Sequence, residues 1–312
     1  MRKRTFLLVL IVFAGFISSF GAQIVTYEFA NKDSALFMDV YMPSNQSITK
    51  TTYPCIIYVF GGGFIAGSRL DSANVAFCKT MCDKGFVVAA IDYRLGLKGK
   101  KMNGLLTAAK NLEYAIHLAV EDLFSSVSFI LNCNDIVTVD TNKIILMGSS
   151  AGAITVLQAD YELGNRTDVT TNIPESFHFA GVVSFAGAVF SRHGLVKYKK
   201  QSPAPTLFFH GTADKLVNYD KTQFANIGFF GSNALEKRFA KFDYPYYIFR
   251  YADLGHEVAG LPQHRNIDDI CWFIENMVFQ KQNYHIDKWL KDDNLIKNRP
   301  GYSGIDPANF YK

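Results

Sequence analysis

Short runs of apolar residues recur along most of the chain, and the central ones are continuous rather than alternating. Residues 55–60 and 86–91 are the clearest examples, and this pattern is typical of strands buried on both faces of a parallel sheet. The two earliest runs alternate between apolar and polar positions, which predicts an antiparallel edge. The predicted strands are 24–29, 36–41, 55–60, 86–91, 144–147, 181–185, 206–209 and 246–250.

Helix-like segments fit between these strands. In one of them apolar residues recur at spacings of three and four, at Leu105, Ala109, Leu112, Ile116 and Ala119, which predicts a stripe packed against a sheet. The alternation of strand and helix predicts a right-handed, doubly wound α/β fold. The predicted helices are 72–84, 104–125, 151–161, 221–229 and 264–280.

The ends of the chain differ from this regular part. Residues 1–22 combine a basic start with an apolar run and then small residues, which predicts a secretory signal peptide and hence export, to the periplasm or outside the cell. The apolar run is shorter than the roughly 20 residues of a spanning helix, so we expect no stable membrane insertion after its removal. Residues 23–281 are predicted to form one α/β domain. Residues 282–312 are polar and are predicted to be a C-terminal extension on the surface.

Composition and charge narrow the classes of partner. The 312 residues are 49% hydrophobic and 19% charged, which excludes a disordered, collagen-like or polytopic membrane protein. The net charge of +4 falls to +1 without the three basic residues of the predicted signal peptide, leaving no electrostatic reason to expect nucleic acid. The five cysteines lack histidines at zinc-site spacing. Cys78 and Cys82, on one face of a predicted helix, form either a bridge or two buried thiols.

The strongest local signal lies at residues 144–153, where a strand runs directly into Gly-x-Ser-x-Gly and then into a helix. This is the nucleophile elbow, a sharp turn that needs small residues two places before and after the serine. Gly148 and Gly152 supply them. Ser150 is therefore the candidate nucleophile, at the carboxyl end of the sheet, where open α/β sheets bind ligands.

A serine hydroxyl needs a base to take its proton, and the base needs a carboxylate to orient it. His256, just beyond the strand 246–250, is the candidate base. Asp214, after the strand 206–209, is the candidate acid, because this fold supplies the three groups in the order Ser, acid, His. Asp220 and Asp253 compete with it for that role. His210, in the same turn as Asp214, is expected to be structural.

Acyl transfer also needs N–H donors aimed at the oxygen that becomes negative. The strand 55–60 ends in three consecutive glycines, which let the backbone approach a substrate closely. Gly62 and Gly63, with the N–H of Ala151 immediately after the nucleophile, are the candidate oxyanion hole. Phe64 and Tyr93 are candidate substrate-binding residues.

Together these motifs resemble the α/β-hydrolase superfamily. The set comprises 61–64 with Gly67-Ser68, Asp92-Tyr93-Arg94-Leu95, 148–152, Asp214 and His256, and within the superfamily it is similar to bacterial carboxylesterases of the hormone-sensitive-lipase-like and xylan-side-chain esterase type. The resemblance implies an α/β-hydrolase fold with a mostly parallel sheet of about eight strands flanked by helices. It also implies hydrolysis of carboxylic esters through an acyl-serine intermediate, with no metal or organic cofactor.

The chain departs from this family at two positions. Phe60 stands where members usually carry a histidine that helps to hold the glycine loop, and Ser149 stands where many have an acidic or bulkier residue. Within the resemblance we expect a short-chain ester substrate, either a small molecule or an acetyl or feruloyl group on a polysaccharide fragment. The alternatives are a serine peptidase of the same superfamily and a catalytically silent binding protein of this fold.

Overall fold

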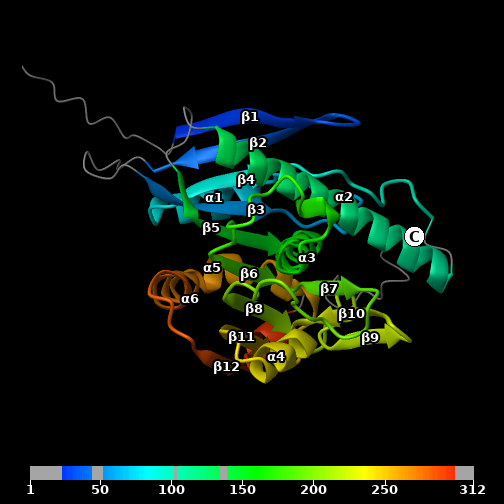
Figure 1. The fold of residues 1–312 in the computed structure, drawn as a ribbon. Helices are drawn as coiled ribbons and strands as arrows, with labels where there is room; N and C mark the ends of the chain where they lie inside the picture. Colours follow the sequence, from blue (N-terminus) through cyan, green and yellow to red (C-terminus); the bar gives the residue numbers. More distant parts are fainter. Residues whose placement is uncertain (1–22, 44–51, 102–103, 134–138, 299–312) are drawn as a thin grey trace, which may run out of the picture.

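The computed structural model describes residues 23–43, 52–101, 104–133 and 139–298. The predicted signal peptide and the last residues of the chain lie outside this part. Nine strands form one sheet in the order β1-β2-β4-β3-β5-β6-β8-β11-β12, which runs from top to bottom in Figure 1. These strands are β1 (Gln23–Asn31), β2 (Ala35–Met42), β3 (Tyr53–Val59), β4 (Val87–Ile91), β5 (Val139–Ser149), β6 (Gly181–Phe185), β8 (Thr206–Gly211), β11 (Tyr246–Tyr251) and β12 (His285–Leu290).

The direction of the strands agrees with the hydrophobic pattern. β1 pairs antiparallel with β2, and β2 pairs antiparallel with β4, whereas every other neighbouring pair in this sheet is parallel. The parallel strands β3, β4, β6, β8 and β11 are buried over nearly all of their length. The predicted antiparallel edge and buried parallel centre are therefore confirmed.

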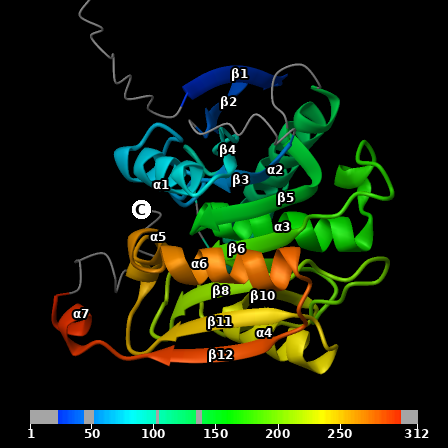
Figure 2. The ribbon, with the colours of Figure 1, turned by 90° about the vertical axis from the view of Figure 1, so that its left-hand side faces the viewer.

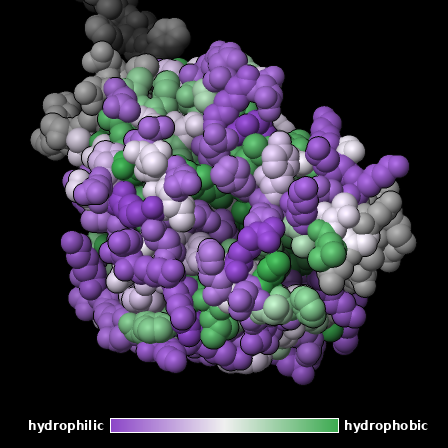
Figure 3. Space-filling view, turned by 45° about the vertical axis from the view of Figure 1, so that its right-hand side comes forward, coloured by the Kyte–Doolittle hydropathy of each residue, from purple (hydrophilic) through white to green (hydrophobic). Residues whose placement is uncertain are grey.

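Helices cover both faces of the sheet. α1 and the α5–α6 segment lie on the face turned to the viewer in Figure 2, and α2 and α3 lie on the opposite face. The face of the molecule drawn in Figure 3 is mainly hydrophilic, with apolar residues scattered in small groups. The helical elements are α1 (Ser72–Asp83), α2 (Leu105–Asn132), α3 (Ala151–Asn165), η1 (Asp168–Thr170), α4 (Ser232–Lys241), η2 (His256–Ala259), α5 (Pro262–Arg265), α6 (Ile267–Phe273), η3 (Ile274–Phe279) and α7 (Asp293–Lys297).

One predicted helix is wrong. Residues 221–229 form the hairpin of β9 (Lys221–Phe224) and β10 (Ile227–Gly231), which pairs with β7 (Ala188–Ser191) in a second, three-stranded sheet. Phe224 pairs with Ile227, so the turn between the strands has only two residues, and Ala225 takes a φ of 51° there. The aromatic and β-branched residues of this segment favour the hairpin over a helix.

The predicted domain boundary at 281 lies between two paired strands of the sheet, β11 and β12. β12, from the predicted extension, pairs in parallel with β11 along its whole length. The α5–α6 segment connects β11 to β12 and forms the crossover that two parallel strands require. Its mixed and largely exposed sequence hides this role, because an edge strand has little of its surface in the core.

The apolar helix α2 and the cysteines complete the core. Within the described residues one helix, Leu106–Asn132, is long and apolar enough to cross a membrane, and half of its apolar window is buried inside the protein. Cys78 and Cys82 are free and buried, so the structure shows two thiols rather than a bridge. Burial raises the pKa of the Cys82 thiol to about 11, which keeps it protonated and unreactive at neutral pH.

Candidate active site

Ser150 lies at the sharp turn between β5 and α3, at the carboxyl edge of the sheet. Its φ of 52° and ψ of −115° are strained for a residue with a side chain. The Ser150 N–H donates to the Phe185 carbonyl at 2.9 Å, which ties the turn to β6. A Cβ on Gly148 would lie 2.3 Å from the Gly152 oxygen, and one on Gly152 would lie 2.0 Å from the Val59 oxygen. Only glycine fits at both places, as the motif predicts.

His256 begins the short turn η2 that follows β11, and its ring is largely buried. Its Nε2 lies 2.7 Å from the Ser150 Oγ, although 106 residues separate the two in the sequence. This is the distance at which a ring nitrogen can accept a hydroxyl proton. The fold therefore brings the candidate nucleophile and the candidate base into direct contact.

Asp214 lies in the turn after β8 and is buried. Its Oδ2 accepts from the His256 Nδ1 at 2.8 Å, and its Oδ1 accepts from the N–H groups of Leu216 and Val217 at 2.9 and 3.1 Å. Burial alone would raise the pKa of Asp214, but hydrogen bonds from His210 and His256 outweigh it and hold the pKa well below its usual range. The carboxylate is therefore ionised at neutral pH.

The two competing carboxylates lie elsewhere. Asp220 accepts from the Asn233 side chain at 2.9 Å and faces Lys237. The backbone of Asp253 donates to the Thr212 hydroxyl at 2.9 Å. Of the three candidate acids, only Asp214 is hydrogen-bonded to His256.

The glycine loop passes close beside the nucleophile. A Cβ built on Gly61 would lie 3.2 Å from the Ser150 Cβ. Gly62 and Gly63 have φ values of 129° and 63°, a left-handed backbone that favours glycine. In the described part of the chain no hydrogen bond takes up their N–H groups, and the N–H of Ala151 is at the free amino end of α3. Three donors are thus available near Ser150.

Phe64 and Tyr93 differ from their predicted role. Phe64 is fully buried and Tyr93 is 4% exposed, so both belong to the hydrophobic core rather than to an exposed substrate surface. The Tyr93 ring stacks on Phe60 at 4.5 Å between centroids, and its hydroxyl donates to the Phe60 carbonyl at 3.0 Å. This packing supports the glycine loop at the position where the resemblance led us to expect a histidine. The aromatic residues are here core residues, which their local sequence does not distinguish from binding residues.

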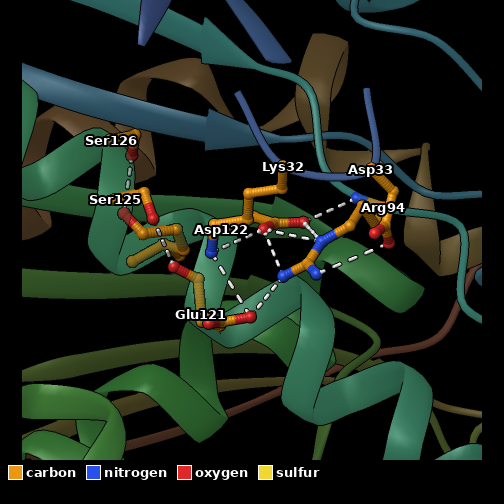
Figure 4. A network of polar contacts seen from close by, with 8 residues as sticks. Lys32, Asp33, Arg94, Glu121, Asp122, Ser125 and Ser126 are labelled. Atoms are coloured by element: carbon orange, nitrogen blue, oxygen red, sulfur yellow. Dashed lines mark hydrogen bonds and ion pairs between the residues drawn. The ribbon is translucent and has the colours of Figure 1, made fainter. Parts of the chain in front are cut away.

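The segment around Tyr93 is itself held by ion pairs. Figure 4 shows the Arg94 guanidinium between Glu121 and Asp122 of α2, and the Lys32 ammonium pairs with the same two carboxylates. The Arg94 Nη2 lies 2.7 Å from the buried Asp122. These contacts fix the carboxyl end of β4, and with it the loop support.

Ser149 has a contact that its sequence position did not predict. Its hydroxyl donates to the Ala259 carbonyl at 2.8 Å, and this links the nucleophile turn to η2, which carries His256. A serine next to the nucleophile is no signal by itself, because its partner lies 110 residues away.

A groove of about 760 Å³ opens beside the nucleophile turn. Gly61 and Ser149 line it at the turn, Leu254 and Glu257 line it next to the base, and Leu295 of α7 contributes from the C-terminal segment. Its lining reaches the turn at Ser149 but includes neither Ser150 nor His256. Within the described residues no three His, Cys, Asp or Glu side chains gather in a way that could hold a metal ion.

A candidate nucleophile, a candidate acid and a candidate base follow β5, β8 and β11 of an open, mostly parallel sheet, which is the arrangement of an α/β-hydrolase. The predicted fold class is thus confirmed. The model of the BD-FAE family matches residues 38–193, half of the chain, and the protein belongs to this family.

Individual relatives agree with this class. The chain is 28% identical over 132 residues to the neuroligin-like protein glit-1 of Caenorhabditis elegans, which is 42% of this chain and 16% of that protein. It is 26% identical over 150 residues to lipase 1 of Geotrichum candidum, which is 47% of this chain and 25% of the lipase. The matched part thus spans a quarter or less of these relatives' length.

The fold also resembles solved structures. Esterase 2 of Thermogutta terrifontis, phosphonylated by cyclosarin, superimposes with a TM-score of 0.60 at 18% identity. The match covers 83% of this chain and 95% of the esterase. It therefore extends the likeness in fold beyond the segment that the family model matches.

Proposed function

We propose that the protein is a serine esterase that hydrolyses carboxylic esters through an acyl-serine intermediate. The observation that carries the proposal is the chain of contacts from Ser150 to His256 at 2.7 Å and from His256 to Asp214 at 2.8 Å. Membership of the BD-FAE family and the likeness to a lipase and to an esterase support it.

In the first half-reaction the His256 Nε2 takes the proton of the Ser150 hydroxyl as its oxygen attacks the ester carbonyl carbon. The carbonyl electron pair moves onto the oxygen. The N–H groups of Gly62, Gly63 and Ala151 stabilise that negative charge, each contributing roughly 3 kcal/mol in comparable sites. His256 then gives its proton to the departing alcohol oxygen, and the acyl group stays on Ser150.

In the second half-reaction water replaces Ser150 as the nucleophile. His256 takes a proton from the water, the hydroxide attacks the acyl carbon, and the same three N–H groups stabilise the new oxyanion. The proton then returns to the Ser150 oxygen as the acid product leaves. Asp214 stays ionised throughout, because its neighbours hold its pKa low, and it keeps the proton-bearing Nδ1 of His256 in place.

The finer proposal concerns substrate and location. We propose an exported enzyme that acts on short acyl groups, such as acetyl or feruloyl groups on polysaccharide fragments. The basic and apolar pattern of residues 1–22 supports export.

The test is hydrolysis of p-nitrophenyl acetate, butyrate and octanoate by the protein from residue 23 onward, beside Ser150→Ala. We expect turnover that falls with chain length and a loss of at least about 10⁴-fold in the variant, since its nucleophile is absent. Acetylated and feruloylated xylan fragments are tested in parallel. Their hydrolysis would support the finer proposal, and hydrolysis of the p-nitrophenyl esters alone would contradict it.

A fluorophosphonate probe and intact-mass measurement provide an independent check. The wild type should gain one phosphonyl group, and Ser150→Ala should gain none. If the folded wild type neither turns over esters nor reacts with the probe, the esterase proposal is wrong, and a silent binding protein becomes the better explanation. Cleavage of peptides without turnover of esters would favour the peptidase instead.

A further inference from the structure

Asp214 contacts a second histidine. His210, at the end of β8, is fully buried, and its Nε2 lies 3.3 Å from the same Oδ2 that accepts from His256. Two histidines from different parts of the chain therefore converge on one oxygen of the acid. The mechanism above uses only His256.

The neighbours of His210 determine which of its nitrogens carries the proton. Nε2 faces the Val217 carbonyl at 2.9 Å and the Asp214 carboxylate, and both are acceptors. Nε2 must therefore carry hydrogen and donate it. Nδ1 lies 2.8 Å from the Ser232 hydroxyl, which can donate to it when the ring is neutral. His210 is thus held as an N–H donor that is hydrogen-bonded to the Val217 carbonyl and also faces the Asp214 carboxylate at 3.3 Å.

The other polar groups around this pair are few. Tyr219 packs edge-on against the His210 ring at 5.5 Å, and Arg250 binds the Tyr219 hydroxyl. The Arg250 charge is paired with Glu236 and Asp287. Among the described residues, the titratable groups that contact the Asp214 carboxylate are the two histidines.

We propose that His210 is a positioning residue for the reaction: its Nε2–H fixes the Asp214 carboxylate and sets how strongly that carboxylate acts on His256. The inference rests on the proposed function. Two donors on one carboxylate oxygen share its negative charge, so the loss of one strengthens the other bond. Without the His210 N–H, Asp214 stabilises the protonated form of His256 more strongly, and the base becomes available only at higher pH.

The test is the pH profile of kcat/KM for a matched pair of variants. In His210→Gln the side-chain amide can place an N–H where Nε2 was, whereas in His210→Asn the shorter amide cannot reach Asp214. We expect His210→Asn to move the acid limb of this profile to higher pH than in the wild type. Its kcat/KM should fall by about threefold to tenfold, the range of one net hydrogen bond. His210→Gln should restore most of the wild-type acid limb and most of the wild-type kcat/KM.

Ser232→Ala is the control, because it perturbs the far side of the His210 ring and leaves the donor to Asp214 in place. An unchanged acid limb there, with a shifted limb in His210→Asn, supports the proposal. A folded His210→Asn whose acid limb coincides with the wild type overturns it, even if kcat/KM falls. If His210→Asn does not fold, the double variant H210F/S232A takes its place, because it removes the Nε2–H without leaving the Ser232 hydroxyl unpaired. Its acid limb should also move to higher pH, and an acid limb that coincides with the wild type overturns the proposal.

Proton NMR separates this inference from the proposed function. The Nδ1 proton of His256 should move downfield in His210→Asn relative to wild type and stay in place in Ser232→Ala. This readout needs no substrate, so it holds even if esterase activity is absent. An unmoved Nδ1 proton in a folded His210→Asn contradicts the positioning role.

Discussion

The nucleophile turn depends on close backbone packing that a single methyl group would disrupt. Gly152 is in contact with the carbonyl end of β3, which leads into the glycine loop, so one residue couples the turn to the loop. The strained Ser150 backbone persists because the surrounding strands and α3 determine it. At the scale of single residues, function therefore rests on small side chains as much as on reactive ones.

Gly152→Ala tests this coupling. A Cβ there would lie 2.0 Å from the Val59 oxygen, so backbone must move. We expect the free energy of unfolding to fall by about 2–3 kcal/mol, in the range of overpacked sites, together with most of the esterase activity. Urea unfolding measures the first quantity. Gly260→Ala is the matched control, because its Cβ would meet nothing within 4 Å, and it should leave stability nearly unchanged.

The elements of the fold place the reacting groups through their carboxyl ends. β5, β8 and β11 run parallel in the sheet, so Ser150, Asp214 and His256 all emerge at one edge. β12 then covers β11 on its outer side and supplies Asp287 to the buried Arg250. The C-terminal segment is thus part of the sheet that holds the base, although its sequence is that of a polar surface extension.

Truncation tests the contribution of β12. A chain that ends at Lys281 loses this strand, exposes the edge of β11 and removes one carboxylate from Arg250. We expect its unfolding free energy to fall by roughly 2 kcal/mol or more, with aggregation through the new edge. A chain that ends at Asn298 keeps β12 and α7 and is the reference in a thermal melt, so the chain that ends at Lys281 should melt at a lower temperature than this reference. Equal melting of both truncated chains would contradict this role.

At the scale of the whole molecule, one buried carboxyl couples stability to pH. Asp160 of α3 is buried, and its Oδ1 accepts only from the Ala204 N–H at 3.3 Å among the described residues. Burial raises the pKa of Asp160 to about 7. The folded state thus holds this proton more tightly than the unfolded state, and stability falls as pH rises from about 4 to about 7.

Asp160→Asn removes that dependence, since an amide carries no charge and its oxygen can still accept from Ala204. The variant should match the wild type in unfolding free energy near pH 4. At pH 8 it should be more stable by up to roughly 4 kcal/mol, given about 1.36 kcal/mol per pKa unit. Chemical denaturation at pH 4, 6 and 8 measures this. Asp268→Asn, at a fully solvated side chain, should show no such trend. A pH-independent difference for Asp160→Asn would refute the interpretation.

Much of the fold was predictable because its signals are local. Each buried strand is a continuous apolar run, and the strand–Gly-x-Ser-x-Gly–helix motif lies within ten neighbouring residues. The hairpin of β9 and β10 was missed since a short segment with mixed polarity fits a helix or a strand equally well until its partner β7 is known. The edge strand β12 was missed for the same reason.

The sequence by itself determined the α/β class, the antiparallel edge, the nucleophile turn and the order of candidate groups, because neighbouring residues encode each of them. Only the tertiary structure decided that Asp214 rather than Asp220 or Asp253 meets His256. It also placed Phe64 and Tyr93 in the hydrophobic core, Ser149 in contact with the segment that carries His256, and His210 in contact with Asp214. These outcomes depend on which distant segments pack together, and no local pattern contains that information.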